Sequence, residues 1–494
     1  MNQMPFDEPN NDVRPGHEAP DELTAAVQHQ VSELARRRDD PAVRHELLKA
    51  LQRRREPSNG EKAASRPGQS PDTYRHDLAK FDFLPAETGF DTLHVQGELL
   101  ITGRSYDGRG VAAAGRGQDK YAKPYLDELG LEASDVECEE LHGRVLRLTS
   151  DRGIETQRLA DVARNLRMRG FAASLTNIAP TAGILKPPPI PSGPVAQAAS
   201  AVQPAPAAAE RAPGGSAPRS GRGMPVKVAI IDTGITAEDR TDGWLKTVPR
   251  LLADIDPLTA FPFPASDPYL DLDAGHGTFV AGLVQRVAPD AEITVYRAID
   301  SDGIASEVAV ACEMIRAVKE GAQIVNLSLG CQTPDDTPPI AIAAALEVIG
   351  ELERETGHQV LVIAAAGNYG DTRPCWPAAF RGVVSVAALA PDMMPAQFSS
   401  RGFWVTCSTI GQGLRSTFVE GQLSPLVSHQ ATVFGPDSWA VWSGTSFTAP
   451  QIAGELARLC QEEGLKPREA LPRLLAQGEP LPDFGQALRI LPSG

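Results

Sequence analysis

The chain has 494 residues, of which 42% are hydrophobic and 22% charged, and its formal net charge is −16. The length exceeds what one ordinary hydrophobic core fills and indicates two or three domains of a globular protein. The acidic balance argues against nucleic acid as a partner, and no apolar run is long enough to span a membrane, so we expect neither kind of partner.

Residues 1–30 contain no apolar segment of the kind found in secretory signals. The six cysteines are scattered without CxxC spacing, which indicates neither a zinc site nor a disulfide framework. They are Cys138, Cys312, Cys331, Cys375, Cys407 and Cys460. We therefore expect a cytoplasmic protein with six free thiols.

Residues 1–75 are expected to form an N-terminal segment that is helical or disordered. Within residues 21–55, Leu23, Val27, Val31 and Leu34 recur at helical spacing. The basic runs of this stretch are expected to be a solvated helix face, with a partner-binding helix pair as the alternative.

Residues 76–185 are expected to form a small α+β domain. Strands are predicted in HVQGELLITG, GRVLRLTS and FAASLTNI, and an amphipathic helix in IETQRLADVARNLRMRG. Residues 186–224 are rich in Pro, Ala, Gly and Ser, cannot bury a core, and are expected to be a linker.

Residues 225–494 show short apolar runs without alternation, typical of strands that are buried on both faces. These runs are VKVAIID, ITVYRAI, QIVNLSLG, VLVIAAAG and VVSVAAL, and helix-like stretches lie between them. The alternation predicts an α/β fold with a doubly wound parallel sheet. Ligands of such sheets bind beyond the carboxyl ends of the strands, where several polar residues of this chain follow.

Three residues of this domain suit a nucleophilic triad. Asp232 ends VAIID, His276 begins the helix-like HGTFVAG, and Ser446 lies in SGTSFTAP. Ser446 would attack a carbonyl, His276 would carry its proton, and Asp232 would orient the imidazole. The alternative reading of Asp232-Thr233-Gly234 as an aspartic protease motif needs two such carboxylates, and the chain shows a single DTG.

An acyl-transfer site also needs donors for the developing oxyanion. Asn368 follows the strand VLVIAAAG and is placed to offer its side-chain amide, with the backbone N–H of Ser446 as the second donor. Gly444 would let a substrate approach, and Pro450 would fall in the first turn of a helix, where a missing N–H costs least.

The motifs VAIIDTG, HGTFVAG, NLSLG, AAAGN and SGTSFTAP occur in the order found in subtilisin-like serine peptidases (subtilases), which the chain resembles from about Val226 to about Ile490. The resemblance implies peptide-bond hydrolysis through an acyl-enzyme. It also implies that Ser328, Leu329 and Gly330 form the edge along which a peptide lies, and that Ala365, Ala366 and Gly367 form the opposite wall of the specificity pocket.

The chain departs from the family in several places. Phe279 stands where the family often has a second histidine, only YGDTRP separates Asn368 from CWPAAF, and an insertion follows VTCSTIGQG. No cofactor or metal is expected. No acidic loop signals calcium, but calcium dependence is left open.

The resemblance also suggests that residues 76–185 are a pro-domain that restrains the peptidase domain, since their size and position match. A module that recognises a regulatory partner is the alternative. The sequence thus predicts a serine endopeptidase acting on proteins or peptides, with cutting inside the linker as the activating event. A catalytically silent peptide-binding or scaffold protein is the rival from another class.

Overall fold

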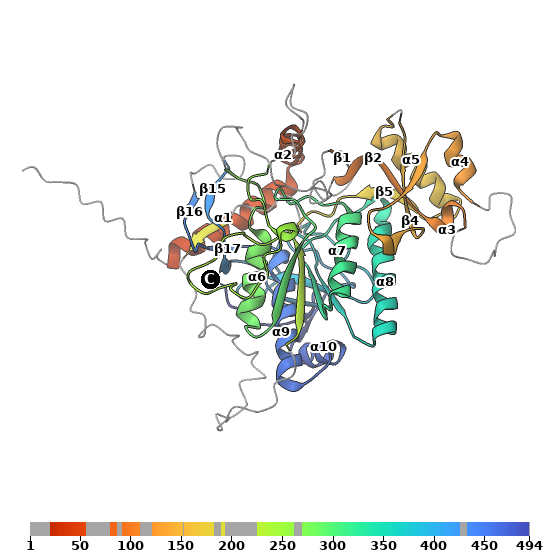
Figure 1. Ribbon diagram of the computed structural model, residues 1–494. Coiled ribbons are helices and arrows are strands. Elements are labelled where there is room, and N and C mark those ends of the chain that lie inside the picture. The colour runs from red at the N-terminus through yellow and green to blue at the C-terminus, as the bar shows by residue number, and fades with distance from the viewer. Residues whose placement is uncertain are drawn as a thin grey trace, which may run out of the picture.

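The computed structural model describes residues 20–55, 80–85, 91–108, 121–151, 153–181, 189–192, 225–260, 269–424 and 432–493; for residues 20–22 it describes the backbone only. Its centre is an eight-stranded sheet with the order β18-β19-β13-β12-β11-β10-β7-β9 (Figure 1). All neighbours in this sheet pair in parallel except β18 and β19. The predicted doubly wound α/β fold is therefore confirmed.

The strands predicted from apolar runs are all members of this sheet. They are β7 (Lys227–Asp232), β9 (Glu292–Arg297), β10 (Ile324–Leu327), β11 (Leu361–Ala365) and β12 (Val383–Leu389). The sheet is completed by β13 (Cys407–Ile410), β18 (Glu479–Leu481) and β19 (Gly485–Ala487).

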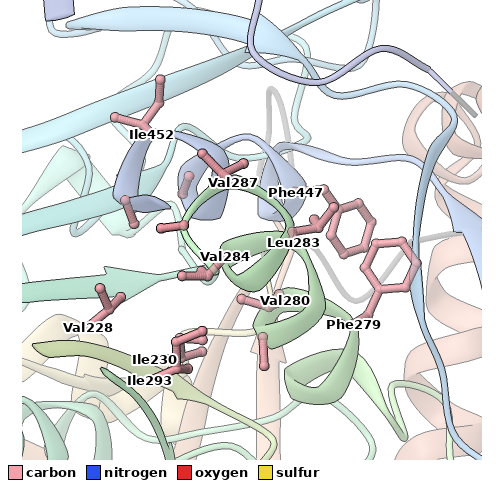
Figure 2. Packing of buried hydrophobic residues seen from close by; sticks show 14 of the residues in the cluster. Val228, Ile230, Phe279, Val280, Leu283, Val284, Val287, Ile293, Phe447 and Ile452 are labelled. Atoms are coloured by element: carbon pink, nitrogen blue, oxygen red, sulfur yellow. The ribbon is translucent and has the colours of Figure 1, made fainter. Parts of the chain in front are cut away.

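Helices cover both faces of the sheet because its strands are apolar on both sides. On one face, α6 (His276–Val287) and α9 (Ala449–Glu463) pack against Val228 and Ile230, and α10 (Pro467–Leu475) follows α9 (Figure 2). On the other face, α7 (Glu307–Lys319) and α8 (Ile340–Thr356) pack against Ala229 and Ile231. Successive residues of β7 therefore point alternately into the hydrophobic cores on the two faces of the sheet.

Two small sheets lie beside the main one. The first has the order β14-β17-β6 and the second β16-β15-β8. Their strands are β6 (Ile190–Ser192), β8 (Tyr269–Leu270), β14 (Leu414–Thr417), β15 (Gly421–Leu423), β16 (Val433–Phe434) and β17 (Trp439–Trp442). The insertion expected after VTCSTIGQG supplies β14 to β17.

Residues 190–192 fall within the stretch expected to be a linker, yet β6 pairs antiparallel with β17 through Ile190, Pro191 and Ser192. Composition could not reveal this strand, because its pairing needs main-chain groups and no apolar side chains. The linker expectation is wrong for these three residues. The residues on either side of them, 182–188 and 193–224, lie outside the described chain.

The small domain is built on an antiparallel sheet of β1 (Phe81–Leu84), β2 (Thr92–Thr102), β3 (Glu132–Asp135), β4 (Val145–Thr149) and β5 (Ala173–Asn177). One face of this sheet buries α5 (Thr156–Met168) through Leu159, Val162 and Leu166, as its periodicity predicted. The short helices α3 (Gly103–Tyr106) and α4 (Lys123–Glu128) complete the domain, which lies next to α7 and α8 (Figure 1).

The N-terminal hairpin consists of α1 (Pro20–Asp39) and α2 (Pro41–Arg54), and it docks on the α/β domain. In α1, Leu34 packs with Ala388 and Phe398, and the side chain of Gln30 donates to the carbonyl of Val441 at 3.1 Å.

The end of α2 carries Arg54 and Arg55, whose side chains are only 3% and 1% exposed. The basic run was expected to be a solvated face, and for these two residues that expectation is wrong. Both guanidinium groups are inserted among aspartates of the α/β domain: Arg54 lies 2.7 Å from Asp271, and Arg55 lies 2.7 Å from Asp300.

A disulfide joins Cys138 of the small domain to Cys312 of α7, at a sequence separation of 174 and with 5.6 Å between the two Cα atoms. The expectation of six free thiols is therefore wrong for this pair. Spacing along the chain gave no sign of it, because the two cysteines meet only when the domains dock. The other four cysteines are free and buried.

Among the described residues, no helix combines the length and apolar character needed to cross a membrane.

Candidate active site

Asp232, His276 and Ser446 come together at the carboxyl end of the main sheet. Asp232 is the last residue of β7, His276 is the first of α6, and Ser446 lies in a single 3-10 turn (Thr445–Phe447) directly ahead of α9. His276 Nδ1 lies 2.6 Å from Asp232 Oδ1, and all three side chains are fully buried. The carboxylate therefore fixes the imidazole with Nε2 facing away from β7.

Ser446 is held by the loop that follows β10. Its Oγ donates to the carbonyl of Ser328 at 3.1 Å, and the Ser328 hydroxyl donates to the carbonyl of Ser446 at 2.7 Å. Among the described residues, His276 Nε2 has no hydrogen-bond partner. The serine–histidine hydrogen bond is thus not formed in this structure; catalytic hydrogen bonds often form only when a substrate is bound.

Asp256, which the sequence did not single out, ties the loops around Asp232 and His276 together. Its Oδ2 accepts from the Thr233 hydroxyl and from the Gly275 backbone N–H, each at 2.9 Å. Burial raises the pKa of Asp256 to about 6. The carboxylate thereby fixes the residue that follows Asp232 relative to the residue that precedes His276.

Gly277 allows α6 to start beside the loop after β7. A Cβ at this position would lie 2.2 Å from the carbonyl oxygen of Gly234, which no side chain tolerates. The glycine after His276 therefore sets how closely the helix bearing the imidazole approaches Asp232.

Aromatic rings enclose the imidazole of His276. The ring centroids of Trp442 and Phe447 lie 5.6 Å and 5.4 Å from that of His276. Phe279, at the family's second-histidine position, packs 4.6 Å from Phe447 and is fully buried (Figure 2). The departure at Phe279 thus contributes to the wall behind the histidine.

Asn368 is positioned by Thr445. Its Oδ1 accepts from the backbone N–H and from the hydroxyl of Thr445, both at 2.9 Å, which leaves Nδ2 as the free end of the amide. Nδ2 is buried, has no hydrogen-bond partner among the described residues, and lies beside Gly444. Gly444 has φ +156° and ψ 158°, a conformation open essentially to glycine alone. An unpaired N–H donor next to the serine is what a developing oxyanion requires.

The two predicted pocket walls face each other across Cys375. A Cβ built on Gly330 or on Gly367 would lie 2.7 Å from the Cys375 Sγ in both cases. The predicted wall residues Ser328, Leu329, Ala365 and Ala366 are fully buried. The sequence did not reveal Cys375, whose thiol lies between the walls and whose pKa burial raises well above its ordinary value.

The end of the small domain occupies the groove between these walls and the loop ahead of α7. The N–H groups of Ala179 and Thr181 donate to the carbonyls of Ala305 and Gly303, at 2.9 Å and 3.1 Å. On the other side, the Gly330 N–H donates to the carbonyl of Pro180 at 2.9 Å. The segment Ile178–Thr181 is thus an extended chain held by main-chain hydrogen bonds on both sides.

Side chains of this segment are also held. Ile178 forms an antiparallel bridge with Ser306 and packs with Ile304, and the Thr181 hydroxyl donates to the carboxylate of Asp273. The sequence did not indicate Gly303, Ala305 or Asp273 as part of the site. The only available signal was the position of Asp273 three residues before His276.

The described residues hold no group of three or more His, Cys, Asp or Glu side chains placed to bind a metal ion. The chemistry that the arrangement supports with its own side chains is proton transfer between a hydroxyl and an imidazole, with one amide donor beside the hydroxyl.

Comparison with known proteins identifies the family and supports the fold of this chain. The sequence model of the subtilase family matches residues 223–477, which is more than half of the chain. The chain is 30% identical over 250 residues to the "Thermophilic serine proteinase" of Bacillus sp. (strain AK1), covering 48% of this chain and 52% of that protein. It is 28% identical over 256 residues to the "Intracellular serine protease" of Paenibacillus polymyxa, covering 49% and 68%.

The alignment with the Bacillus proteinase spans about half of that relative's own length. Among solved structures, the crystal structure of fervidolysin from Fervidobacterium pennivorans, described as a keratinolytic enzyme related to subtilisin, superposes with a TM-score of 0.51 at 18% identity. That match covers 83% of this chain and 61% of fervidolysin, and it supports the fold. By its family match and its fold, the chain belongs to the subtilase family.

Proposed function

We propose that this protein is a serine endopeptidase in which Ser446 is the nucleophile, His276 the general base and acid, and Asp232 the carboxylate that orients the imidazole. Asn368 Nδ2 and the backbone N–H of Ser446 serve as the oxyanion donors. The proposal is supported by the Asp232–His276 contact of 2.6 Å and by the relatives that are named serine proteases.

One observation carries the proposal: a groove beside Ser446 holds an extended peptide by its main chain. Ile178–Thr181 are bonded from both sides by Gly303, Ala305 and Gly330. Such pairing recognises any extended peptide, while side-chain pockets select the sequence. A protein or peptide is therefore the proposed substrate.

The proposed reaction begins with rotation of the Ser446 hydroxyl away from the Ser328 carbonyl and toward His276 Nε2. The imidazole takes the hydroxyl proton as Oγ attacks the scissile carbonyl, and Asp232 stabilises the imidazolium. The proton then passes to the leaving amine, and water hydrolyses the acyl-enzyme by the same route in reverse. The aromatic wall of Trp442 and Phe447 keeps bulk water from His276.

We further propose that the N-terminal region restrains the enzyme, because the groove that would bind a substrate holds Ile178–Thr181 instead. A cut of the chain after this segment is the first step in relieving the restraint. The structure argues for this reading over a pure recognition module, since a module for another partner would not need to occupy the groove. Cytoplasmic location stays a prediction.

The test is labelling with a fluorophosphonate probe, together with peptide hydrolysis, by wild-type protein and by Ser446→Ala. We expect wild-type protein, once cut and freed of its N-terminal region, to label and to hydrolyse peptides, and Ser446→Ala to do neither. His276→Ala should behave like Ser446→Ala, because triad members act as a unit. If correctly folded wild-type protein binds peptides without labelling, the chain is the catalytically silent peptide-binding protein and the proposal is wrong.

A further inference from the structure

The disulfide Cys138–Cys312 is the one covalent link, other than the main chain, that the described residues show between the small domain and the α/β domain. Cys138 lies between β3 and β4 of the small domain, and Cys312 lies in the middle of α7. The N-terminus of α7 borders the groove, since Ser306, its N-cap, bridges to Ile178. The disulfide therefore holds the restraining domain to the helix next to the groove that the domain fills.

The non-covalent contacts around this disulfide are of two kinds. Val136, Leu141 and Val145 pack on apolar residues of α7 and α8. Ion pairs surround this patch, among them Arg144–Glu351 at 2.7 Å, with both side chains about two-fifths exposed. Exposed ion pairs of this kind contribute little free energy to the association of the two domains. Without the disulfide, the N-terminal region would be retained only by non-covalent contacts. These are the apolar patch, the groove contacts, the hydrogen bonds that Asn177 donates to buried Glu307, and the docked α1–α2 hairpin with its Arg54 and Arg55 ion pairs.

We propose that Cys138–Cys312 is a redox latch, so that release of the restraining region requires both a cut in the chain and reduction of this disulfide. The inference rests on the proposed function and concerns its regulation. Before the cut, the main chain tethers the region. After the cut, the disulfide keeps the region at an effective concentration on the order of millimolar, so it continues to fill the groove.

The releasing reaction is a thiol–disulfide exchange with a dithiol reductant. One thiolate of the reductant attacks either sulfur and forms a mixed disulfide, and the second thiol of the reductant then displaces the protein sulfur. The reductant becomes a disulfide, and Cys138 and Cys312 each become thiols, with two electrons and two protons transferred. Both cysteines are partly exposed, so a reductant can reach them.

The other thiols are poorly suited to this exchange. Cys331, Cys375 and Cys407 are buried, and burial raises the pKa of each thiol, which lowers the thiolate fraction that reacts. Cys460 is also buried, and burial raises its pKa to about 11. We therefore expect any effect of a reductant on activity to arise from reduction of the Cys138–Cys312 disulfide.

The first experiment separates the latch from catalysis. Full-length Ser446→Ala, with a recognition site for a site-specific protease inserted after Ala182, is cut with that protease and diluted to nanomolar concentration. We expect the two fragments to run as one species on a denaturing gel without reductant, and to co-elute in gel filtration. Added dithiothreitol should separate them in both measurements.

The matched control carries Cys138→Ser and Cys312→Ser in the same background, and its fragments should separate without reductant. Fragments of the cysteine-containing protein that separate in denaturant without reductant would show that the bond does not form. Fragments that still co-elute after full reduction would show that the bond does not control release. Either result overturns the latch, whether or not the protein is a peptidase.

The second experiment measures peptide hydrolysis by wild-type protein after its own cutting. Dithiothreitol should raise the activity by at least about tenfold, because dilution then removes a region that had been held at millimolar effective concentration. The Cys138→Ser, Cys312→Ser double variant should be fully active without reductant, and Cys460→Ser should respond as wild type does. Equal activity with and without reductant in wild-type protein would refute the latch; no hydrolysis by any variant would instead refute the proposed function and leave the release measurement to decide the latch.

Discussion

The carbonyl of Pro180 accepts a hydrogen bond from the Gly330 N–H at 2.9 Å, so the end of the small domain is aligned with the strand edge that leads to Ser446. Residue 182 lies outside the described residues; we infer that an antiparallel register continued by two residues would pair it with Ser328. The Ser328 carbonyl is the group to which the Ser446 hydroxyl now donates. This inferred register points to the bond after Ala182 as the candidate for cutting by Ser446.

We therefore predict that wild-type protein cuts itself between Ala182 and Gly183. The sequence alone placed the cut in the linker, between about Lys186 and Met224; the alignment moves it upstream. A cut there leaves β6 attached to β17, because β6 begins at Ile190. Intact mass and N-terminal sequencing of the larger fragment will check this, with Ser446→Ala as the control that stays full length. A fragment that begins beyond β6 would show that the alignment does not set the cut.

Asn368→Asp tests the oxyanion donor with little change of shape. The aspartate keeps an oxygen to accept from Thr445 and loses the Nδ2 donor, so the Thr445 loop should keep its position. Removing one such donor lowers kcat by roughly 10²–10³, a magnitude measured in subtilisin itself. We expect kcat to fall by that factor with little change in KM. An unchanged kcat in steady-state peptide hydrolysis would place the donor elsewhere.

The residues of the proposed site could be predicted from sequence because each lies at the end of a predicted strand or at the start of a predicted helix, and the fold brings these ends together. Asp232 ends the apolar run that forms β7, and Asn368 follows the run that forms β11. Parallel strands bring their carboxyl ends to one edge of the sheet. His276 is the first residue of α6 and Ser446 lies just ahead of α9, and both helices pack on that sheet. The local sequence pattern and the topology of a parallel sheet were together sufficient to nominate these residues.

The restraint could not be predicted in the same way, because its contacts join segments that are far apart and carry no motif. Cys138 and Cys312 are 174 residues apart. Arg55 meets Asp300 only because the hairpin docks where it does. Thr181 is held in the groove by a main-chain hydrogen bond, and the identity of its side chain does not predict such a bond. Periodicity and composition describe single elements and say nothing of such pairings.

Arg55→Ala should destabilise the full-length protein, because it removes the guanidinium that lies 2.7 Å from buried Asp300. Removing one partner of a buried ion pair costs about 3–5 kcal/mol, since the other charge stays buried. The matched control is Arg53→Ala, which changes the exposed neighbour on the same helix. Urea unfolding in the Ser446→Ala background, where no cutting occurs, will compare the two. Equal stability of the two variants would contradict the buried pair.

The cost of Arg55→Ala should depend on pH. Burial already raises the pKa of Asp300 and of Asp302 to about 6. Below pH 6 these carboxyls take up protons and no longer need a cationic partner, whereas above pH 6 they are ionised. The difference in unfolding free energy between Arg55→Ala and Arg53→Ala should therefore be larger at pH 8 than at pH 5. The opposite trend would show that charge is not what Arg55 supplies.

His94 should make the small domain sensitive to acid. This histidine lies in β2, is fully buried, and has Nε2 2.8 Å from the Thr92 hydroxyl. Burial lowers its pKa from 6.5 to about 3, so between these values the unfolded chain binds a proton that the folded chain does not. The resulting stability is fully present above pH 6.5 and is lost as pH falls toward 3, by up to about 1.4 kcal/mol per pH unit.

We predict that His94→Gln removes this dependence while its amide still reaches Thr92. Between pH 7 and pH 5, the loss of unfolding free energy measured in urea should be smaller in His94→Gln than in the parent Ser446→Ala protein, by about 2 kcal/mol. His358→Gln, which changes an exposed histidine, should lose as much as the parent does. If His94→Gln and the parent lose the same amount, the histidine is protonated in the folded domain, and the buried, neutral state argued for it is wrong.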